Sequence, residues 1–322
     1  MRYGGSISFV ESLETFGQNL ADIKPTTFQG VPRIYTKFQE KILSKMSQKK
    51  LNIFLKIPLV SSLIKKKLQA ALGLTEVRVV VSGAAALPVS LIDWYKTIGI
   101  YIFNGYGMTE NCCVCTALDP YQPLGVGSVG TVSSPSVKLK ITDEGEICMT
   151  GPFLLDSYYK NEEVTKETLK DGWLHTGDLG HIDDDGFLYV TGRVKDLFKT
   201  TKGKYIEPLV LESHFTDFSE FEQICVVGLG LDQPICLGVL SEIGKDKTKE
   251  DIKSFMSKHL EKINFELPGY QKISTFVVVK NPWTVENGLT TPTMKIKRNQ
   301  IDKIYDSNFS KWHNDQEKVI FE

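Results

Sequence analysis

The segment NGYGMTEN, at residues 104–111, places an aromatic ring, a hydroxyl group and a carboxylate close together. It continues the apolar run YIF, and a second apolar run, VRVVVSG (77–83), precedes it with the helical pattern VSLIDWYKTIG between them. A strand–helix–strand order favours a parallel sheet, in which ligands bind beyond the carboxyl ends of the strands. The sequence therefore predicts a ligand-binding edge that carries Tyr106, Thr109 and Glu110.

Further segments combine glycines with charged or hydroxyl groups. They are GEICMTGP (145–152), GWLHTGDLG (172–180), GRVKDLFKTTKGKYIEP (192–208) and LTTPTMKIKR (289–298). Each of them alone is compatible with a turn or a solvated run of charges. Together with YGMTE, in this order and spacing, they form a specific signal.

Other motifs have simpler interpretations. GVGSVG (125–130) has the dinucleotide spacing, but a strand-like segment follows it where that site requires a helix. HIDDDG (181–186) matches only part of a calcium loop and predicts a tight turn between strands. Cys112, Cys113 and Cys115 have no second pair at ligand spacing, so they predict small buried side chains on a strand.

Composition limits the class of protein that must position these groups. The chain has 322 residues, a formal net charge of −1 and 41% apolar residues, which predicts a globular protein of about two domains and excludes nucleic acid as the main partner. No apolar run is long enough for a membrane span, and the start has no signal-peptide pattern. We therefore expect a cytoplasmic protein with six reduced cysteines.

The predicted fold class is α/β. Residues 11–49 predict helix, turn and helix, and short strands with turns follow residue 123. We place a domain boundary near residue 193. Residues 1–192 then form part of a large domain, a parallel sheet with helices plus a β-rich subdomain, and residues 193–322 form a small α+β C-terminal domain.

One segment has a marked charge bias. Between Ile42 and Thr75 the chain has seven lysines and no acidic residue, and the lysines alternate with apolar residues at nearly helical spacing. Peripheral membrane contact through a helix pair is one interpretation. A helical hairpin, split at Pro58 and with solvated lysines, is the one we favour, because such patterns usually belong to surface helices.

The dispersed segments resemble those of adenylate-forming enzymes, the superfamily of acyl-CoA synthetases, peptide-synthetase adenylation domains and luciferases. SFVESLETFGQNLADIKPTTFQGVPRIYTKF and LTTPTMKIKR resemble the long-chain fatty acyl-CoA synthetase branch, and the resemblance covers essentially the whole chain. It implies ATP-dependent ligation of a long-chain fatty acid to coenzyme A through an acyl-adenylate. It also implies binding of ATP or AMP, of Mg²⁺ and of coenzyme A.

The resemblance assigns nucleotide-binding roles within the large domain. The residues expected near the nucleotide are Gly83, Ala84, Asn104, Gly105, Tyr106 and Gly107. Tyr106 is expected to stack on the adenine, and the glycines let backbone approach it. Thr109 is expected to act on the α-phosphate and Glu110 to bind Mg²⁺, which prefers hard oxygen ligands.

The remaining roles that the resemblance implies lie further along the chain. Asp178 is expected to accept hydrogen bonds from the ribose hydroxyls, with Arg193 as a second ribose contact. Lys295 is the expected catalytic cation, which bridges the attacking carboxylate and the α-phosphate. Lys195 is the expected hinge of a mobile small domain, and Gly203 is expected to leave room for the pantetheine arm of coenzyme A.

Neighbours of these residues are assigned no chemistry. Trp173 and His175 are expected to pack, and Lys297 and Arg298 are expected to be solvated or to lie on a domain interface. The adenylation step needs no general base, because a carboxylic acid is already ionised at neutral pH.

The chain departs from the family pattern in one respect. The phosphate loop of the form T-S-G-T-T-G-x-P-K is absent, as is the Walker form, and TTKGK (200–204) resembles them only superficially. We therefore expect Met1 to lie inside the large domain, and we expect weak or no ATP–pyrophosphate exchange by this chain alone. Two alternatives stay open: an enzyme that loads an acyl carrier protein, and a truncated, non-catalytic relative that binds a nucleotide or a partner.

Overall fold

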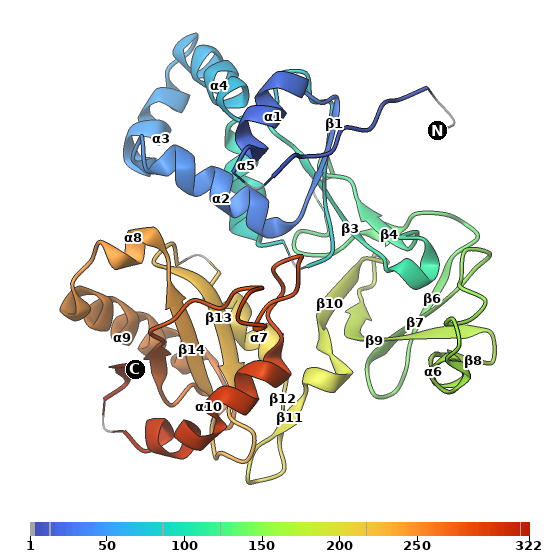
Figure 1. Ribbon diagram of the computed structural model, residues 1–322, viewed down its shortest axis with the longest axis vertical. Coiled ribbons are helices and arrows are strands. Elements are labelled where there is room, and N and C mark those ends of the chain that lie inside the picture. The colour runs from blue at the N-terminus through green and yellow to red at the C-terminus, as the bar shows by residue number, and fades with distance from the viewer. Residues whose placement is uncertain (1–3, 13, 86, 123, 217, 316) are drawn as a thin grey trace. The chain divides into compact units, whose positions relative to one another are not determined.

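The computed structural model describes residues 4–12, 14–85, 87–122, 124–216, 218–315 and 317–322. They form two compact units, which are described separately below; the elements are labelled in Figure 1. The first unit consists of Met1–Lys138, Gly151–Asp156 and Asp184–Leu188, and the second of Leu139–Thr150, Ser157–Asp183 and Tyr189–Glu322. These units describe packing, and the domain boundary near residue 193 stays a prediction.

A five-stranded sheet lies at the centre of the first unit, in the order β1–β2–β3–β4–β5. Its strands are β1 (Thr27–Gly30), β2 (Val79–Ser82), β3 (Ile102–Tyr106), β4 (Thr116–Leu118) and β5 (Thr131–Val132). The helices of this unit are α1 (Phe16–Ile23), α2 (Pro32–Leu43), α3 (Gln48–Lys56), α4 (Val60–Ala71), α5 (Val89–Thr97) and the 3₁₀ turn η1 (Thr109–Asn111). The mixed α/β architecture confirms the predicted fold class.

The parallel part of this sheet has the predicted order. β1, β2 and β3 pair in parallel, and β4 and β5 continue the sheet antiparallel. α5 follows Pro88, which favours a helix start, and Gly99 ends the segment with a φ of +79° that suits glycine. The helix–turn–helix predicted for residues 11–49 is wrong in one respect, because the short strand β1 lies between α1 and α2.

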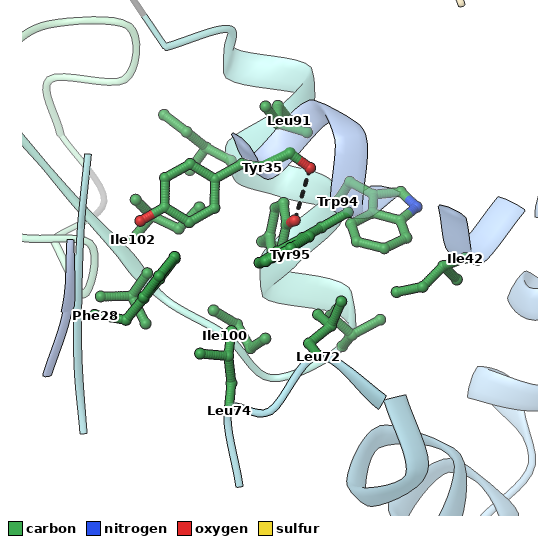
Figure 2. Packing of buried hydrophobic residues seen from close by; sticks show 14 of the residues in the cluster. Phe28, Tyr35, Ile42, Leu72, Leu74, Leu91, Trp94, Tyr95, Ile100 and Ile102 are labelled. Carbon is green, nitrogen blue, oxygen red and sulfur yellow. Dashed lines mark hydrogen bonds between the residues drawn. The ribbon is translucent and has the colours of Figure 1, made fainter. Parts of the chain in front are cut away.

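Two buried tyrosines connect the helices of the first unit to its sheet. The Tyr35 hydroxyl donates to the Val81 carbonyl at 2.8 Å, and the Tyr95 hydroxyl donates to the Tyr35 carbonyl at 2.8 Å. Figure 2 shows this pair within a cluster of aromatic and aliphatic side chains. A buried hydroxyl without a partner would destabilise the fold, so these bonds fix α2 against β2 and α5 against α2.

The second unit contains a β-rich part and an α+β part. Its first sheet has the order β10–β9–β7–β6, with β8 on β9, and its last sheet has the order β13–β14–β15–β16. The strands of this half of the chain are β6 (Lys138–Ile141), β7 (Glu146–Thr150), β8 (Leu169–Lys170), β9 (Trp173–Ile182), β10 (Leu188–Arg193), β11 (Phe198–Lys199), β12 (Tyr205–Ile206), β13 (Phe221–Val227), β14 (Ile235–Leu240), β15 (Phe276–Val278) and β16 (Val319–Phe321). Its helices are α6 (Glu162–Thr168), η2 (Val194–Asp196), α7 (Pro208–Ser213), α8 (Glu242–Lys245), α9 (Lys249–Glu266) and α10 (Arg298–His313).

Helices cover both faces of the last sheet. Strand residues alternate between two buried clusters, so Val226 packs with α9 while Cys225 and Val227 pack with α10. The side chain of Thr248 caps α9 by accepting from the Asp251 amide at 3.1 Å. A bilayer-spanning helix is absent from the described part of the chain, because each helix there is too short or too polar.

Candidate active site

The predicted ligand-binding edge lies at the carboxyl ends of β2 and β3. Ser82 and Asn104 are aligned partners on these parallel strands, and both are buried. The Asn104 amide donates to the Ser128 carbonyl at 3.0 Å, but Asn104 Oδ1 and Ser82 Oγ have no hydrogen-bond partner among the described residues. Buried polar atoms of this kind usually bond to protein, ligand or water. The two oxygens therefore depend on water or on a ligand for a hydrogen-bond partner.

The segment that follows β3 is a compact turn around η1. The Met108 amide donates to the Asn111 side chain at 2.9 Å, and the Cys113 amide donates to the Met108 carbonyl at 2.8 Å. A Cβ at Gly107 would lie 2.7 Å from Cys113 backbone atoms, so the turn itself requires glycine there. Within this turn the Thr109 side chain is exposed and Glu110 is half-buried.

Two of the three neighbouring cysteines do not have the predicted environment. Cys112 and Cys113 are exposed and have φ values of 54° and 58°, so they lie in a left-handed turn. Their prediction as buried strand residues is wrong, because Gly107 and η1 turn the chain before it reaches β4. Cys115 is buried beside β4, and burial raises the pKa of its thiol to about 12.

The loop on the other side of this edge follows β2. Gly83 lies near the carbonyl of Gly105, which would be 3.6 Å from a Cβ at residue 83. Ala84 has a φ of +68°, a backbone conformation that a residue with a side chain rarely adopts. Such outliers concentrate at ligand sites. Ala86, in the same SGAAALP segment, lies outside the described residues.

In the second unit, Asp178 and Arg193 form an ion pair. Asp178 is buried on β9, and Arg193 ends β10 with an exposed side chain. Arg193 Nε donates to Asp178 Oδ1 at 2.6 Å. The Asp178 amide donates to the Thr176 hydroxyl at 3.0 Å, which fixes the backbone beside the carboxylate.

Lys295 is part of a tight turn that precedes α10. The Thr291 amide donates to the Lys295 carbonyl at 2.8 Å, and Thr290 and Ile296 form an antiparallel bridge. Partial burial, followed by the positive charge of Arg193, lowers the pKa of Lys295, whereas Asp178 acts in the opposite direction. These three charged groups, from well-separated segments, therefore lie close enough to influence one another.

The sequence-predicted residues thus form two sets. The structure brings together residues 104–110 with Gly83 and Ala84 in the first unit. It brings together Asp178, Arg193 and Lys295 in the second unit. Lys195 lies in η2, and Gly203, with a φ of +72°, lies in the turn between β11 and β12.

Sequence reasoning missed the position of Glu146. One carboxylate oxygen of Glu146 accepts from the Gly177 amide at 2.9 Å, and the other lies 2.7 Å from His175 Nδ1. Gly177 directly precedes Asp178 in a stretch where the register of β7 and β9 shifts, so Glu146 fixes the backbone next to Asp178. The sequence signal for this role is the triplet GEI (145–147). It does not identify the partner, Gly177, which lies 31 positions away.

Glu146 and His175 also lie near Cys148, in an arrangement that could in principle hold a metal ion. The ligand atoms of the three residues lie within 4.8 Å of one another. However, their mutual hydrogen bonds already account for the cluster, and burial raises the pKa of the Cys148 thiol to about 11. Two lysines also act on Cys148, which makes the environment less favourable for a cation. We therefore interpret the cluster as structural.

The expectation for Arg298 is wrong. Its side chain is only 14% exposed at the start of α10, where it donates to Glu212 Oε1 at 2.7 Å and to the Val226 carbonyl. A guanidinium so far from solvent needs such an anion, because an unpaired charge would be strongly destabilising. The sequence does not indicate this pairing, since the two residues are 86 positions apart.

Comparison with solved structures defines the class of fold. The structure matches an anthranilate CoA ligase in complex with anthranoyl-AMP with a TM-score of 0.69 and 22% identity, covering 92% of this chain and 52% of that one. It matches the adenylation and carrier didomain of a carboxylic acid reductase from Segniliparus rugosus, in complex with AMP, with a TM-score of 0.72 and 22% identity, covering 94% and 43%. The fold is that of the adenylation domains.

The sequence comparisons define the family. The model of the AMP-binding enzyme family matches residues 1–159, and that of the AMP-binding enzyme C-terminal domain matches residues 195–317. The chain belongs to the family of AMP-binding enzymes, as the resemblance of its motifs to those of adenylate-forming enzymes implied.

Curated relatives include long-chain fatty acid ligases. The chain is 31% identical to long-chain-fatty-acid–CoA ligase 5 of Mus musculus, covering 94% of this chain and 51% of the relative. It is 31% identical to the peroxisomal long chain acyl-CoA synthetase 7 of Arabidopsis thaliana, covering 92% and 49%. The chain thus spans about half the length of the curated relatives it matches.

Proposed function

We propose that this chain carries part of the active site of an AMP-forming ligase that joins a long-chain fatty acid to coenzyme A. The observation that carries the proposal is the grouping of Asp178, Arg193 and Lys295, which come from three segments far apart in the sequence. Identity to long-chain-fatty-acid–CoA ligases over 94% of the chain supports the choice of substrate class.

The proposed first step joins two anions. The fatty acid carboxylate attacks the α-phosphorus of ATP, a P–O bond forms, and pyrophosphate leaves. Two unit charges 4 Å apart repel by about 4 kcal/mol at an effective dielectric of 20. Lys295 supplies the cation that offsets this repulsion where charge concentrates in the transition state. In the second step, the thiol of coenzyme A attacks the acyl carbon and AMP leaves.

The residues present fit the nucleotide and its metal. The unpartnered oxygens of Ser82 and Asn104 at the strand ends suit polar groups of the nucleotide, and Tyr106 supplies a ring for stacking. Glu110 offers carboxylate oxygens of the kind that Mg²⁺ prefers, and a bound Mg²⁺ would neutralise phosphate charge. Asp178, held by Arg193, offers acceptors for the ribose hydroxyls.

The roles of the other predicted residues complete this proposal. Thr109 donates its hydroxyl to the α-phosphate, and Gly105 and Gly107 allow backbone to approach the nucleotide. Lys195 acts as the hinge and Gly203 leaves room for the pantetheine arm.

A complementation experiment tests the proposal. The chain is mixed with a separately produced N-terminal half of a long-chain relative that carries the phosphate loop, and ATP–pyrophosphate exchange is measured with and without a long-chain fatty acid. We expect fatty-acid-dependent exchange in the mixture and little exchange by the chain alone, together with AMP binding by the chain in calorimetry. Absence of AMP binding by the folded chain would contradict the proposal.

The acceptor is tested on the same mixture. The carrier domain in the Segniliparus rugosus didomain structure makes a carrier protein a reasonable second acceptor to test. Thioester formation is measured with coenzyme A and with a phosphopantetheinylated acyl carrier protein. We expect coenzyme A to be the better acceptor, and a preference for the carrier protein would reassign the second step.

A further inference from the structure

The helical hairpin α3–α4 has one apolar face that the first unit covers. Leu51 is fully buried in the core, and Leu55, Ile64 and Leu68 pack against the same cluster. Polar contacts anchor both helices: Trp94 Nε1 donates to the Gln48 side chain at 2.9 Å, and the Gln69 side chain donates to the Ile98 carbonyl at 3.1 Å. The orientation of the hairpin is therefore well defined.

The hairpin also has an outer apolar face that is exposed in the described chain. Ile53 is 60% exposed, Ile57 42%, Leu59 84% and Leu63 68%. Ile53 lies on α3 and Leu63 on α4, and Ile57 and Leu59 lie in the connection between the two helices. We call these four residues the outer face. The core of the first unit does not explain their presence, because the contacts of the hairpin with the core are made by Leu51, Leu55, Ile64 and Leu68.

The tip of the hairpin has an unusual backbone conformation. Leu59 has a φ of +67°, which is an outlier for a bulky residue, and it is the most exposed residue of the outer face. A glycine or asparagine would adopt this conformation at lower cost. The chain instead presents a large aliphatic side chain at the most prominent position, and strained residues of this kind are often functional.

Positive charge surrounds the outer face. Between Ile42 and Thr75 there are seven lysines and no acidic residue. Lys49 lies four residues before Ile53, and Lys66 and Lys67 lie three and four residues after Leu63, with all three side chains exposed. At these spacings the lysines lie on the same side of each helix as the aliphatic residues.

We propose that the outer face of α3–α4 docks on an anionic lipid bilayer. The four aliphatic side chains enter the headgroup region, and the lysines contact anionic headgroups beside them. The uniform sign of the charge complements a membrane surface, and long lysine stems can lie along the apolar region while their ammonium groups stay hydrated. The proposal does not depend on the ligase activity.

Flotation with vesicles tests the proposal. The chain is mixed with vesicles of phosphatidylcholine alone or with about one third phosphatidylserine, and bound protein is measured after centrifugation through a density gradient. We expect flotation only with the anionic vesicles, and less of it as salt screens the lysines. Recovery of the wild-type chain entirely in the unbound fraction with anionic vesicles would overturn the proposal.

Variants separate the two contributions. The pair Leu59→Ser and Leu63→Ser is expected to lower the partition coefficient by about tenfold or more for each leucine. The set Lys49→Gln, Lys66→Gln and Lys67→Gln is expected to lower it by about fivefold for each lysine. Phe265→Ser is the matched control, because Phe265 is 88% exposed on α9, outside the hairpin, and its loss should leave flotation unchanged.

The same variants test whether a second copy of the chain, in place of a membrane, binds the outer face. All replaced side chains are exposed, so melting temperatures should stay close to that of the wild type. Flotation of the two-leucine variant at the wild-type level would overturn the proposal. So would self-association of the wild-type chain, measured by ultracentrifugation, that these serine substitutions abolish, because the outer face would then bind a second copy.

Discussion

The two sets of candidate site residues differ in how they are built. The segment at the end of β3 is local and mostly neutral, and it depends on buried side chains, backbone hydrogen bonds and the close fit of Gly107. The set in the second unit combines Asp178, Arg193 and Lys295 from distant segments, and it depends on charge. The tightly packed positions of the first set, such as Gly107, cannot change without changing the fold around them, whereas Lys295 and Arg193 in the second set have exposed side chains.

The difference predicts which substitutions should affect stability together with ligand binding, and which should affect activity alone. Substitution at a tightly packed position of the first set, such as Gly107, should lower the free energy of unfolding as well as ligand binding. Substitution of Lys295 should lower activity and leave the free energy of unfolding nearly unchanged, because its side chain is exposed.

The largest expected effect is that of Lys295→Ala. We expect adenylation by the complemented chain to fall about 10²–10³-fold, because a preorganised cation aimed at developing charge is lost. The unfolding free energy should change by less than about 0.5 kcal/mol, as for other exposed positions. Single-turnover adenylate formation and urea unfolding measure the two quantities. A Lys295→Ala variant with lowered stability and a normal adenylation rate would contradict the difference between the two sets.

Asp178→Ala should mainly affect nucleotide binding. Loss of a charged acceptor of two hydroxyl hydrogen bonds should weaken AMP binding by about 1.5–3 kcal/mol, roughly 10- to 150-fold. Calorimetry with AMP measures the loss. Calorimetry with 2′,3′-dideoxy-AMP is the control, since wild type and variant should bind it equally. If the variant lost the same factor with both ligands, Asp178 would not act on the ribose.

Gly107→Ala should destabilise the first unit. The added Cβ would lie 2.7 Å from the Cys113 backbone, and forced overpacking typically costs about 1–3 kcal/mol. Urea unfolding measures the change. Gly83→Ala is the matched control, because its nearest neighbour would lie at an ordinary contact distance of 3.6 Å. Equal stability of the two variants would show that the turn is less tightly packed than described.

Glu146→Ala should have a smaller effect, which acts through Asp178. Without the acceptor for the Gly177 amide, we expect AMP to bind more weakly by about 1 kcal/mol, or roughly fivefold. Glu146→Gln keeps an acceptor oxygen and should restore most of the affinity. In the Asp178→Ala background, Glu146→Ala should have no further effect, and a fully additive loss would contradict the positioning role.

The smallest expected effect is a shift in pH dependence. In the proposed function Lys295 acts as an ammonium group, and burial and then the charge of Arg193 lower its pKa. The alkaline decline of kcat/KM should therefore begin at a lower pH than for an ordinary lysine, since the ammonium is lost as pH rises through its pKa. Arg193→Gln removes one lowering charge and should move the decline to higher pH. A pH profile that Arg193→Gln left unchanged would show that the alkaline decline does not arise from Lys295.

Sequence reasoning succeeded where the pattern was local. The parallel pair β2–β3, the intervening α5 and the hairpin α3–α4 all follow from hydrophobic periodicity with Pro and Gly at the ends. β1 was missed because four residues are too few to show an alternating pattern. The exposure of Cys112 and Cys113 depends on a turn whose geometry composition does not indicate.

Sequence reasoning from local patterns did not predict pairs of residues that lie far apart in the chain. Asp178, Arg193 and Lys295 were found only through the family pattern, since no local rule connects residues in β9, at the end of β10 and before α10. Arg298 and Glu146 were misjudged or missed for the same reason, because their partners lie 86 and 31 positions away.

The anchoring of Arg298 has a mechanical consequence for Lys295, which lies three residues before it. Arg298 is bonded to Glu212 and to the Val226 carbonyl of β13, and the bridge between Thr290 and Ile296 closes the turn on the other side. The backbone of the lysine is therefore held rigidly, and little of its freedom is left to lose when an anion arrives. Under the proposed function, a small molecule that displaced the Arg298 side chain from Glu212 and Val226 would slow adenylation without contacting the nucleotide.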